Sequence, residues 1–118
     1  MDVRVEWDPN ISAIVQAAAI EGLNRAAAEL LGLALELVPY RTGDLSRAGT
    51  IQPANGESAI AYVVFNIFYA VHVHEGVGMT FSTTKNPNAQ AKFLENPAID
   101  NEALLVDIVG AAIRRALR

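Results

Sequence analysis

The stretch from about Asn10 to Leu37 most constrains the fold, because its pattern predicts one long helix that is apolar around most of its circumference. Glu21, Arg25 and Glu29 lie four apart and can pair along one exposed stripe, which is narrow. A helix of this kind packs on more than one side. It is either a central core helix or one that also forms a subunit contact. The apolar positions recur at spacings of three to five: Ile14, Ala18, Leu23, Ala26, Leu30, Leu33 and Leu37.

Local signals place the ends of this helix. Asp8-Pro9 is a typical helix start, because the carboxylate can cap free amides and proline tolerates the first helical position. Pro39 predicts the end, since it disfavours helical geometry at Val38 and supplies no amide. The turn that follows, Thr42-Gly43-Asp44-Leu45, predicts a short helical segment through Ala48 with Thr42 or Asp44 as its cap.

Strand patterns occur on both sides of the long helix. The alternation of Val3, Val5 and Trp7 with charged residues predicts an N-terminal strand. After the helix, Asn55-Gly56 is a two-residue hairpin signal between strands at 50–52 and 59–65, and a third strand is expected at 68–75. The apolar run at 62–65 predicts a middle strand covered on both faces, with helices on one and a neighbour on the other.

The C-terminal segment predicts a last helix, with Asn96 as cap and Pro97 at its first position. Its expected apolar stripe comprises Ile99, Ala103, Val106, Val109 and Ile113. The predicted fold class is therefore α+β: a small antiparallel sheet (an N-terminal strand plus a three-stranded meander), a long N-terminal helix and a C-terminal helix packed mainly on one face. We expect residues 1–118 to form one domain with a long flexible loop at about 76–90.

Composition limits the classes of function. Of 118 residues, 52% are hydrophobic and 19% charged, which is apolar for a small monomer and favours burial against copies or partners. A net charge of −4 argues against gripping nucleic acid, and the absence of cysteine excludes disulfides and thiolate–metal sites. We expect no signal peptide and no membrane span, because no apolar run reaches the roughly 18–20 residues required.

Residues 76–90 lack periodicity and are rich in turn-forming residues, which in a compact domain is typical of a functional or disordered loop. Met79 and Phe81 are the large apolar side chains within it. Such side chains either tuck back onto their own domain or dock into a neighbour, where a few buried anchors can dominate the contact.

His72 and His74 are the only histidines. On the expected strand at 68–75 both would project from one face, and two imidazoles could bind zinc or another divalent ion. Such a site needs a third ligand, and no carboxylate lies at a recognisable ligand spacing. Catalytic signatures such as a nucleophile elbow or a phosphate loop do not occur either. We therefore expect no catalytic residue, no cofactor and no bound metal.

Three blocks in order carry a family resemblance. They are Val38-Pro39-Tyr40-Arg41-Thr42-Gly43-Asp44-Leu45-Ser46-Arg47, then Tyr69-Ala70-Val71-His72-Val73-His74-Glu75, then Ala91-Lys92-Phe93-Leu94-Glu95. Together they resemble the small minor-capsid or head–tail joining proteins of long-tailed bacteriophages. The chain departs from the commonest pattern at Arg41, where an acidic residue is frequent. Its 76–90 loop also lacks the histidine or glycine-rich cluster often found there.

The resemblance implies a non-enzymatic virion protein at the neck of a tailed phage, made in the host cytoplasm. Its partners would be copies of itself in a ring and the neighbouring neck, portal-side connector and tail proteins, with DNA passing through unbound and no membrane involved. The expected assembly contacts are Met79, Phe81, Lys85, Arg41 and Arg47. Three alternatives are a minor capsid protein elsewhere on the head, a small metal-binding enzyme or regulator using His72 and His74, and a cytosolic interaction module.

Overall fold

The computed structural model describes residues 2–6, 13–40 and 42–117. Its elements are β1 (Asp2–Glu6), α1 (Ala13–Leu35), α2 (Asp44–Arg47), β2 (Gly49–Gln52), β3 (Ile60–Phe65), α3 (Ala70–His74), α4 (Glu95–Asp100) and α5 (Glu102–Ala116). The mixed α+β class is confirmed. The predicted start of the long helix at Asp8-Pro9, the predicted strand position Trp7 and the candidate contact Arg41 lie outside the described residues.

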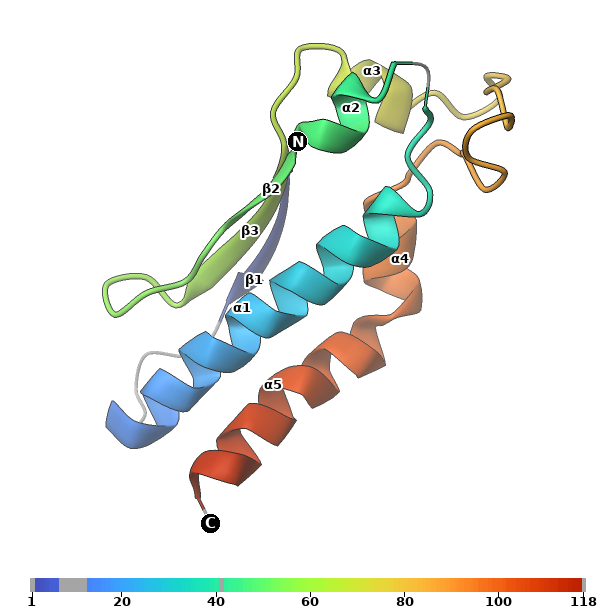
Figure 1. Cartoon of the computed structure of the whole chain (residues 1–118). Helices are drawn as coiled ribbons and strands as arrows, with labels where there is room; N and C mark the ends of the chain where they lie inside the picture. Colours follow the sequence, from blue (N-terminus) through green and yellow to red (C-terminus); the bar gives the residue numbers. More distant parts are fainter. Residues whose placement is uncertain (1, 7–12, 41, 118) are drawn as a thin grey trace.

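The strands form one antiparallel sheet in the order β1-β3-β2. Helix α1 lies against one face of this sheet, and α5 packs antiparallel along the opposite side of α1 (Figure 1). Both long helices are therefore on one side of the sheet, as predicted, but α5 is separated from the sheet by α1. The molecule is elongated, with extents of 48 × 23 × 20 Å.

Helix α1 has the central position that its apolar circumference predicted. Leu23 and Leu30 are fully buried in the core, together with Val63 and Phe65 of β3. Small residues allow α5 to approach closely: a Cβ added at Gly22 would lie only 2.8 Å from the Cα of Val109. One side of α1 thus packs on the sheet and another on α5, so its broad apolar surface is used largely within the chain.

The hairpin of β2 and β3 forms, but its turn differs from the prediction. The backbones of Asn55 and Ser58 bond to each other, so Gly56 and Glu57 occupy the tip. The side chain of Asn55 accepts hydrogen bonds from the amides of Glu57 and Ser58 at 2.8 and 3.0 Å, which closes the turn from one side. Asparagine thus precedes the tip residues instead of being one of them.

The predicted third strand of the meander is wrong, because residues 70–74 form α3. Ala70 and His74 are its buried residues, four apart on one face of a helix. Within the described part of the chain, one face of β3 is covered as predicted, and the neighbour expected on the other face stays a prediction. Ala61, Val63 and Phe65 are buried, whereas Ile60, Tyr62 and Val64 on the other face are only partly buried.

Two helix starts also differ from the predictions. Gly43 precedes α2 with φ 85°, and neither Thr42 nor Asp44 caps it; the Thr42 hydroxyl instead donates to the Asp44 carboxylate at 2.9 Å. Helix α4 begins at Glu95, so Asn96 is not its cap and Pro97 lies in the first turn, where a missing N–H is harmless. The predicted C-terminal apolar stripe is wrong in part. Val109 is buried, as expected, but Ile99 and Val106 are 64% and 63% exposed.

Candidate functional site

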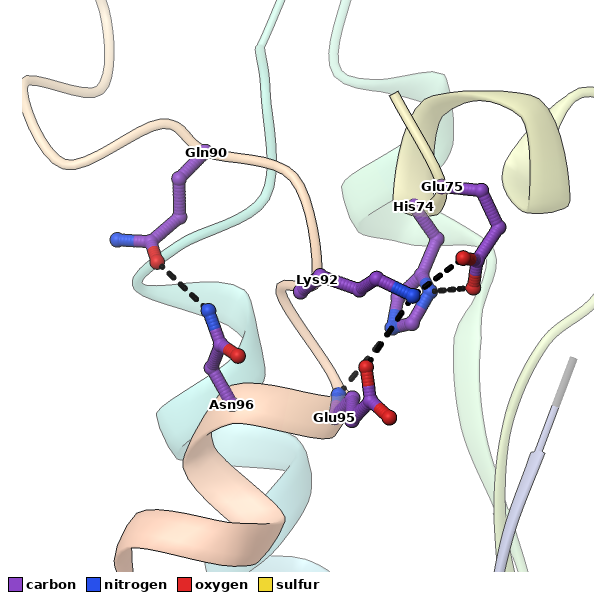
Figure 2. A network of polar contacts seen from close by, with 6 residues as sticks. All are labelled: His74, Glu75, Gln90, Lys92, Glu95 and Asn96. Atoms are coloured by element: carbon purple, nitrogen blue, oxygen red, sulfur yellow. Dashed lines mark hydrogen bonds and ion pairs between the residues drawn. The ribbon is translucent and has the colours of Figure 1, made fainter. Parts of the chain in front are cut away.

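His74 occupies a buried position at the end of α3, with a relative exposure of 5%. Its Nδ1 lies 2.8 Å from a carboxylate oxygen of Glu75, and its Nε2 accepts the backbone N–H of Glu95 at 3.2 Å (Figure 2). A backbone amide can only donate, so Nε2 must be the acceptor and the proton lies on Nδ1. The partners therefore assign a neutral imidazole with both nitrogens engaged.

Lys92 completes this cluster from the other side of the loop. Its ammonium bonds to the Glu75 carboxylate and lies 3.2 Å from that of Glu95 (Figure 2). Its own amide donates to the carbonyl of His74 at 2.7 Å, and its backbone has a left-handed φ of 56°. Residues other than glycine rarely adopt this conformation, so the surrounding contacts hold Lys92 in it. We call His74, Glu75, Lys92 and Glu95 the loop clamp.

Electrostatics within the loop clamp follow from these bonds. The hydrogen bond from Lys92, and next that from His74, hold the pKa of Glu75 below its ordinary value. The same bond to Glu75 is the largest cause that raises the pKa of Lys92, with Glu95 adding to it. Glu75 is thereby kept ionised and Lys92 protonated, which suits a fixed ion pair. Neither group is poised to exchange a proton near neutral pH.

The loop clamp is anchored in the core through Phe93. Its ring is fully buried and meets Phe65 and His74 edge-on, each at a centroid distance of 5.1 Å. The two sequence blocks around His74-Glu75 and Lys92–Glu95 are therefore one structural unit that joins both ends of the 76–90 loop. Lys92 contacts both acidic residues of this unit, Glu75 and Glu95.

The second half of the loop is tied down near the C-terminal end of α1. The side chain of Asn86 donates to the carbonyl of Val38 at 2.8 Å, and the amide of Gln90 donates to that of Leu37 at 3.0 Å. Asn96 further binds the side chain of Gln90 at 3.2 Å (Figure 2). The segment from Gly76 to Lys85 lies beyond these tethers and projects from the body of the molecule (Figure 1).

His72 does not join His74. The two residues lie in a helix, where side chains two positions apart point in nearly opposite directions, and His72 is exposed whereas His74 is buried. The expectation that both project from one face is therefore wrong. Within residues 2–6, 13–40 and 42–117, no cluster of three or more histidine, aspartate or glutamate side chains could hold a metal ion.

A groove of about 890 Å³ lies between the turn after α1, helix α3 and the projecting loop. Its lining includes three aromatic residues, Tyr40, Tyr69 and Phe81, together with Leu45. The ammonium of Lys85 lies 5.2 Å from the centre of the Tyr40 ring, a cation–π contact at the rim. This arrangement can accept an apolar or aromatic side chain from another protein.

The candidate assembly residues are only partly brought together. Phe81 and Lys85 line the groove, and Phe81 is half-buried there. Met79 is 44% exposed and packs over Gly76, outside the residues that line the groove. Arg47 bonds to the Asp44 carboxylate at 2.5 Å and to the Thr42 carbonyl at 3.2 Å. Hydrogen bonds from Thr42 and then from Arg47 lower the pKa of Asp44. Arg47 and Asp44 therefore form an ion pair within α2.

Sequence reasoning missed Phe68, the most exposed aromatic residue in the part of the chain that the structure describes. Phe68 is 96% exposed just before α3, and Val71 within α3 is 54% exposed. Val77 and Met79, immediately after α3, are 74% and 44% exposed. We call these four residues the apolar end. Phe68 was missed because residues 68–75 were assigned to a strand. The four-residue spacing of Ala70 and His74 was the signal for a helix, and this helix turns Phe68 outward.

Comparisons with models of protein families, with curated proteins and with solved structures find no match. In the part of the chain that the structure describes, no helix is long and apolar enough to span a membrane.

Proposed function

We propose that this chain is a non-enzymatic structural protein of a tailed bacteriophage particle, forming a ring in the neck that completes or joins head and tail around the DNA channel. The observation that carries the proposal is the loop clamp. The residues of two of the three blocks behind the family resemblance bond to one another there. Their role is architectural, because they fix both ends of a projecting loop. Residues with such a role suit a protein whose task is to present a surface.

The surface so presented is suited to protein contacts. The apolar end and the groove lie at the same end of the elongated molecule, next to α3. Phe68 is a large apolar side chain that is 96% exposed and meets the ring of Tyr69 edge-on at a centroid distance of 5.2 Å. Tyr69, with Tyr40 and Phe81, also lines the groove. Exposed apolar surface of this kind marks interaction sites. Repetition of a head-to-tail contact by rotation closes a ring when the rotation angle allows closure.

The net charge of −4 fits the remainder of the proposal. A ring around DNA must let the duplex pass, and acidic proteins do not gain the phosphate contacts that hold nucleic acid. Head–tail joining therefore requires binding to the neighbouring neck, connector and tail proteins, without an affinity for the DNA itself.

Of the alternatives, a minor capsid role elsewhere on the head would use the same surface and differs only in location. A metal-binding enzyme or regulator using His72 and His74 gains nothing from their arrangement, since both nitrogens of His74 are engaged within the chain. Elemental analysis after dialysis tests this alternative. One equivalent of zinc retained through chelator treatment would favour it over the structural role.

Inactivation of the gene in the genome that carries it tests the proposal. Electron microscopy of the lysate is expected to show DNA-filled heads and free tails, with joined particles restored by the wild-type gene in trans. Normal yields of joined, infectious particles without the gene would refute the proposal. The flanking genes give a second, independent check, because portal, capsid and tail-tube genes should lie beside it.

A further inference from the structure

The outer side of the C-terminal helices carries an apolar seam. Ile99 of α4 is followed by Ala103, Val106, Gly110, Ile113 and Leu117, at alternating steps of four and three residues. Ile99, Val106 and Leu117 are 64%, 63% and 65% exposed. The residues that face the core are mainly a different set, Leu105, Ile108, Val109 and Ala112, while Ile113 lies at the boundary, partly buried and packed against the core. The exposed seam residues Ile99, Val106 and Leu117 thus form a second apolar surface that the core does not cover.

Alternating steps of four and three are the period of a coiled coil. An apolar stripe with this spacing can follow a partner helix over several turns. A side chain that docks into a single pocket does not need so long and regular a stripe. The backbone bonds Asn101 N–H to Pro97 and Leu105 N–H to Asn101, each at 3.0 Å, continue the helical pattern past the break between α4 and α5. The seam therefore extends over both helices, and its natural occupant is another helix.

We propose that the seam of one copy packs antiparallel against the seam of a second copy, forming a two-fold dimer. Side-chain sizes favour this orientation. With the axis near residue 108, Ile99 faces the second copy's Leu117, and the small Ala103 and Gly110 each face a larger apolar residue, Ile113 and Val106. Each layer then pairs complementary volumes. A parallel pairing would set glycine against glycine and alanine against alanine, leaving gaps.

The charges beside the seam select the same orientation. Asp100, Asp107 and Arg114 each follow a seam residue, so they occupy one flank. Antiparallel packing brings Asp100 of each copy opposite Arg114 of the other, on both sides of the axis. Asp107 meets its counterpart near the axis, where each is already paired with its own Arg114 at 3.2 Å.

A parallel pairing gives the opposite result. It would place Glu102 of each copy beside Asp107 of the other, which is repulsive twice over. The acidic start and basic end of α5 thus make the helix complementary to itself only when the second copy is reversed. This inference does not rest on the proposed function: the seam lies on α4 and α5, and the apolar end and groove lie beside α3.

Sedimentation of the full chain with matched variants tests the dimer. The wild type is expected to dimerise, and Val106→Glu to weaken dimerisation at least tenfold. Leu104→Glu is the control, since Leu104 is also exposed, at 43%, on the same helix but off the seam; it should dimerise like the wild type. A wild type that stays monomeric at all concentrations, or a dimer indifferent to Val106→Glu, would overturn the proposal.

Cross-linking tests the orientation, because the natural chain contains no cysteine. Chains carrying Ile99→Cys and chains carrying Leu117→Cys are mixed in equal amounts and oxidised. Antiparallel packing predicts the mixed 99–117 disulfide as the main product. Main products that join 99 to 99 and 117 to 117 would show parallel packing, and an absence of cross-links would show that these seams do not meet; either result contradicts the proposal.

Discussion

The Nε2 of His74 accepts the backbone N–H of Glu95 at 3.2 Å, so a buried imidazole joins two positions separated by the whole 76–90 loop. One side chain thereby sets the distance between the end of α3 and the start of α4. Its other nitrogen contacts Glu75, which in turn holds Lys92. The local order of the protein's most irregular segment depends on this ring.

We predict that His74→Ala lowers the free energy of unfolding by about 2–4 kcal/mol, because it leaves a donor without its acceptor and removes the ring that packs on Phe93. His72→Ala is the matched control: the residue is exposed, and its loss should change stability by less than about 0.5 kcal/mol. Urea unfolding of both variants makes the comparison. Equal losses would contradict the assignment of distinct roles to the two histidines.

The ion pair of Glu75 predicts a pH dependence. The folded pKa of Glu75 lies below its ordinary value of 4.5, chiefly through Lys92, so its contribution is present above pH 4.5 and is lost as the pH falls through the folded pKa. Glu75→Gln should therefore flatten the decline of stability on the acid side. Lys92→Met should do the same, since it removes the main cause. Unfolding curves collected from pH 7 downward test this, and an unchanged acid decline in both variants would refute it.

Glycines in α1 provide a test of the helix packing. A Cβ at Gly22 would lie 2.8 Å from the backbone of Val109, so Gly22→Ala should cost about 1–3 kcal/mol through overpacking against α5. At Gly32 an added Cβ would meet no other described atom within 4 Å, so Gly32→Ala should gain about 0.5–1 kcal/mol from helix propensity. Opposite signs are expected in thermal or urea unfolding. A gain in stability from Gly22→Ala would show that α5 does not pack closely on α1 at Gly22.

The sequence predicted the type of the longer elements. The long helix, the β2–β3 pairing and the C-terminal helical region follow from the periodicity of their apolar residues. Residues 70–74 were misassigned because Val71 and Val73 alternate with histidines as in a strand, whereas burial of Ala70 and His74 favours a helix. The apolar stripe of α5 was misassigned because two of its faces are apolar, and periodicity alone cannot tell which one meets α1.

Of the candidate site, only the pairing of its charged residues could be predicted from the sequence. Lys92 is opposite in charge to Glu75 and Glu95, and the three residues lie in two of the blocks that carry the family resemblance. The left-handed φ of Lys92 had no signal, since glycine or asparagine normally marks that conformation. The full exposure of Phe68 depends on the turn between β3 and α3, which is set by the packing of Ala70 and His74 in the core.

The apolar end and the groove should respond differently to truncation. Phe68 has 96% of its surface exposed, so Phe68→Ala should change stability by less than about 0.5 kcal/mol yet reduce head–tail joining at least tenfold, as loss of an interface anchor does. Phe81 is half-buried in the groove, so Phe81→Ala should also lower stability, by about 1–3 kcal/mol. Thermal unfolding and a complementation assay measure the two effects. A Phe68→Ala protein that joins heads to tails normally would show that Phe68 is not an anchor.

Localisation of the protein in purified particles tests the central claim most directly. Particles carrying a tagged copy are labelled with a gold-conjugated antibody and imaged by electron microscopy, with untagged particles as the control. The structural role in the neck predicts label at the head–tail junction of each particle. Label spread over the head, or its absence from particles that contain all other virion proteins, would contradict it.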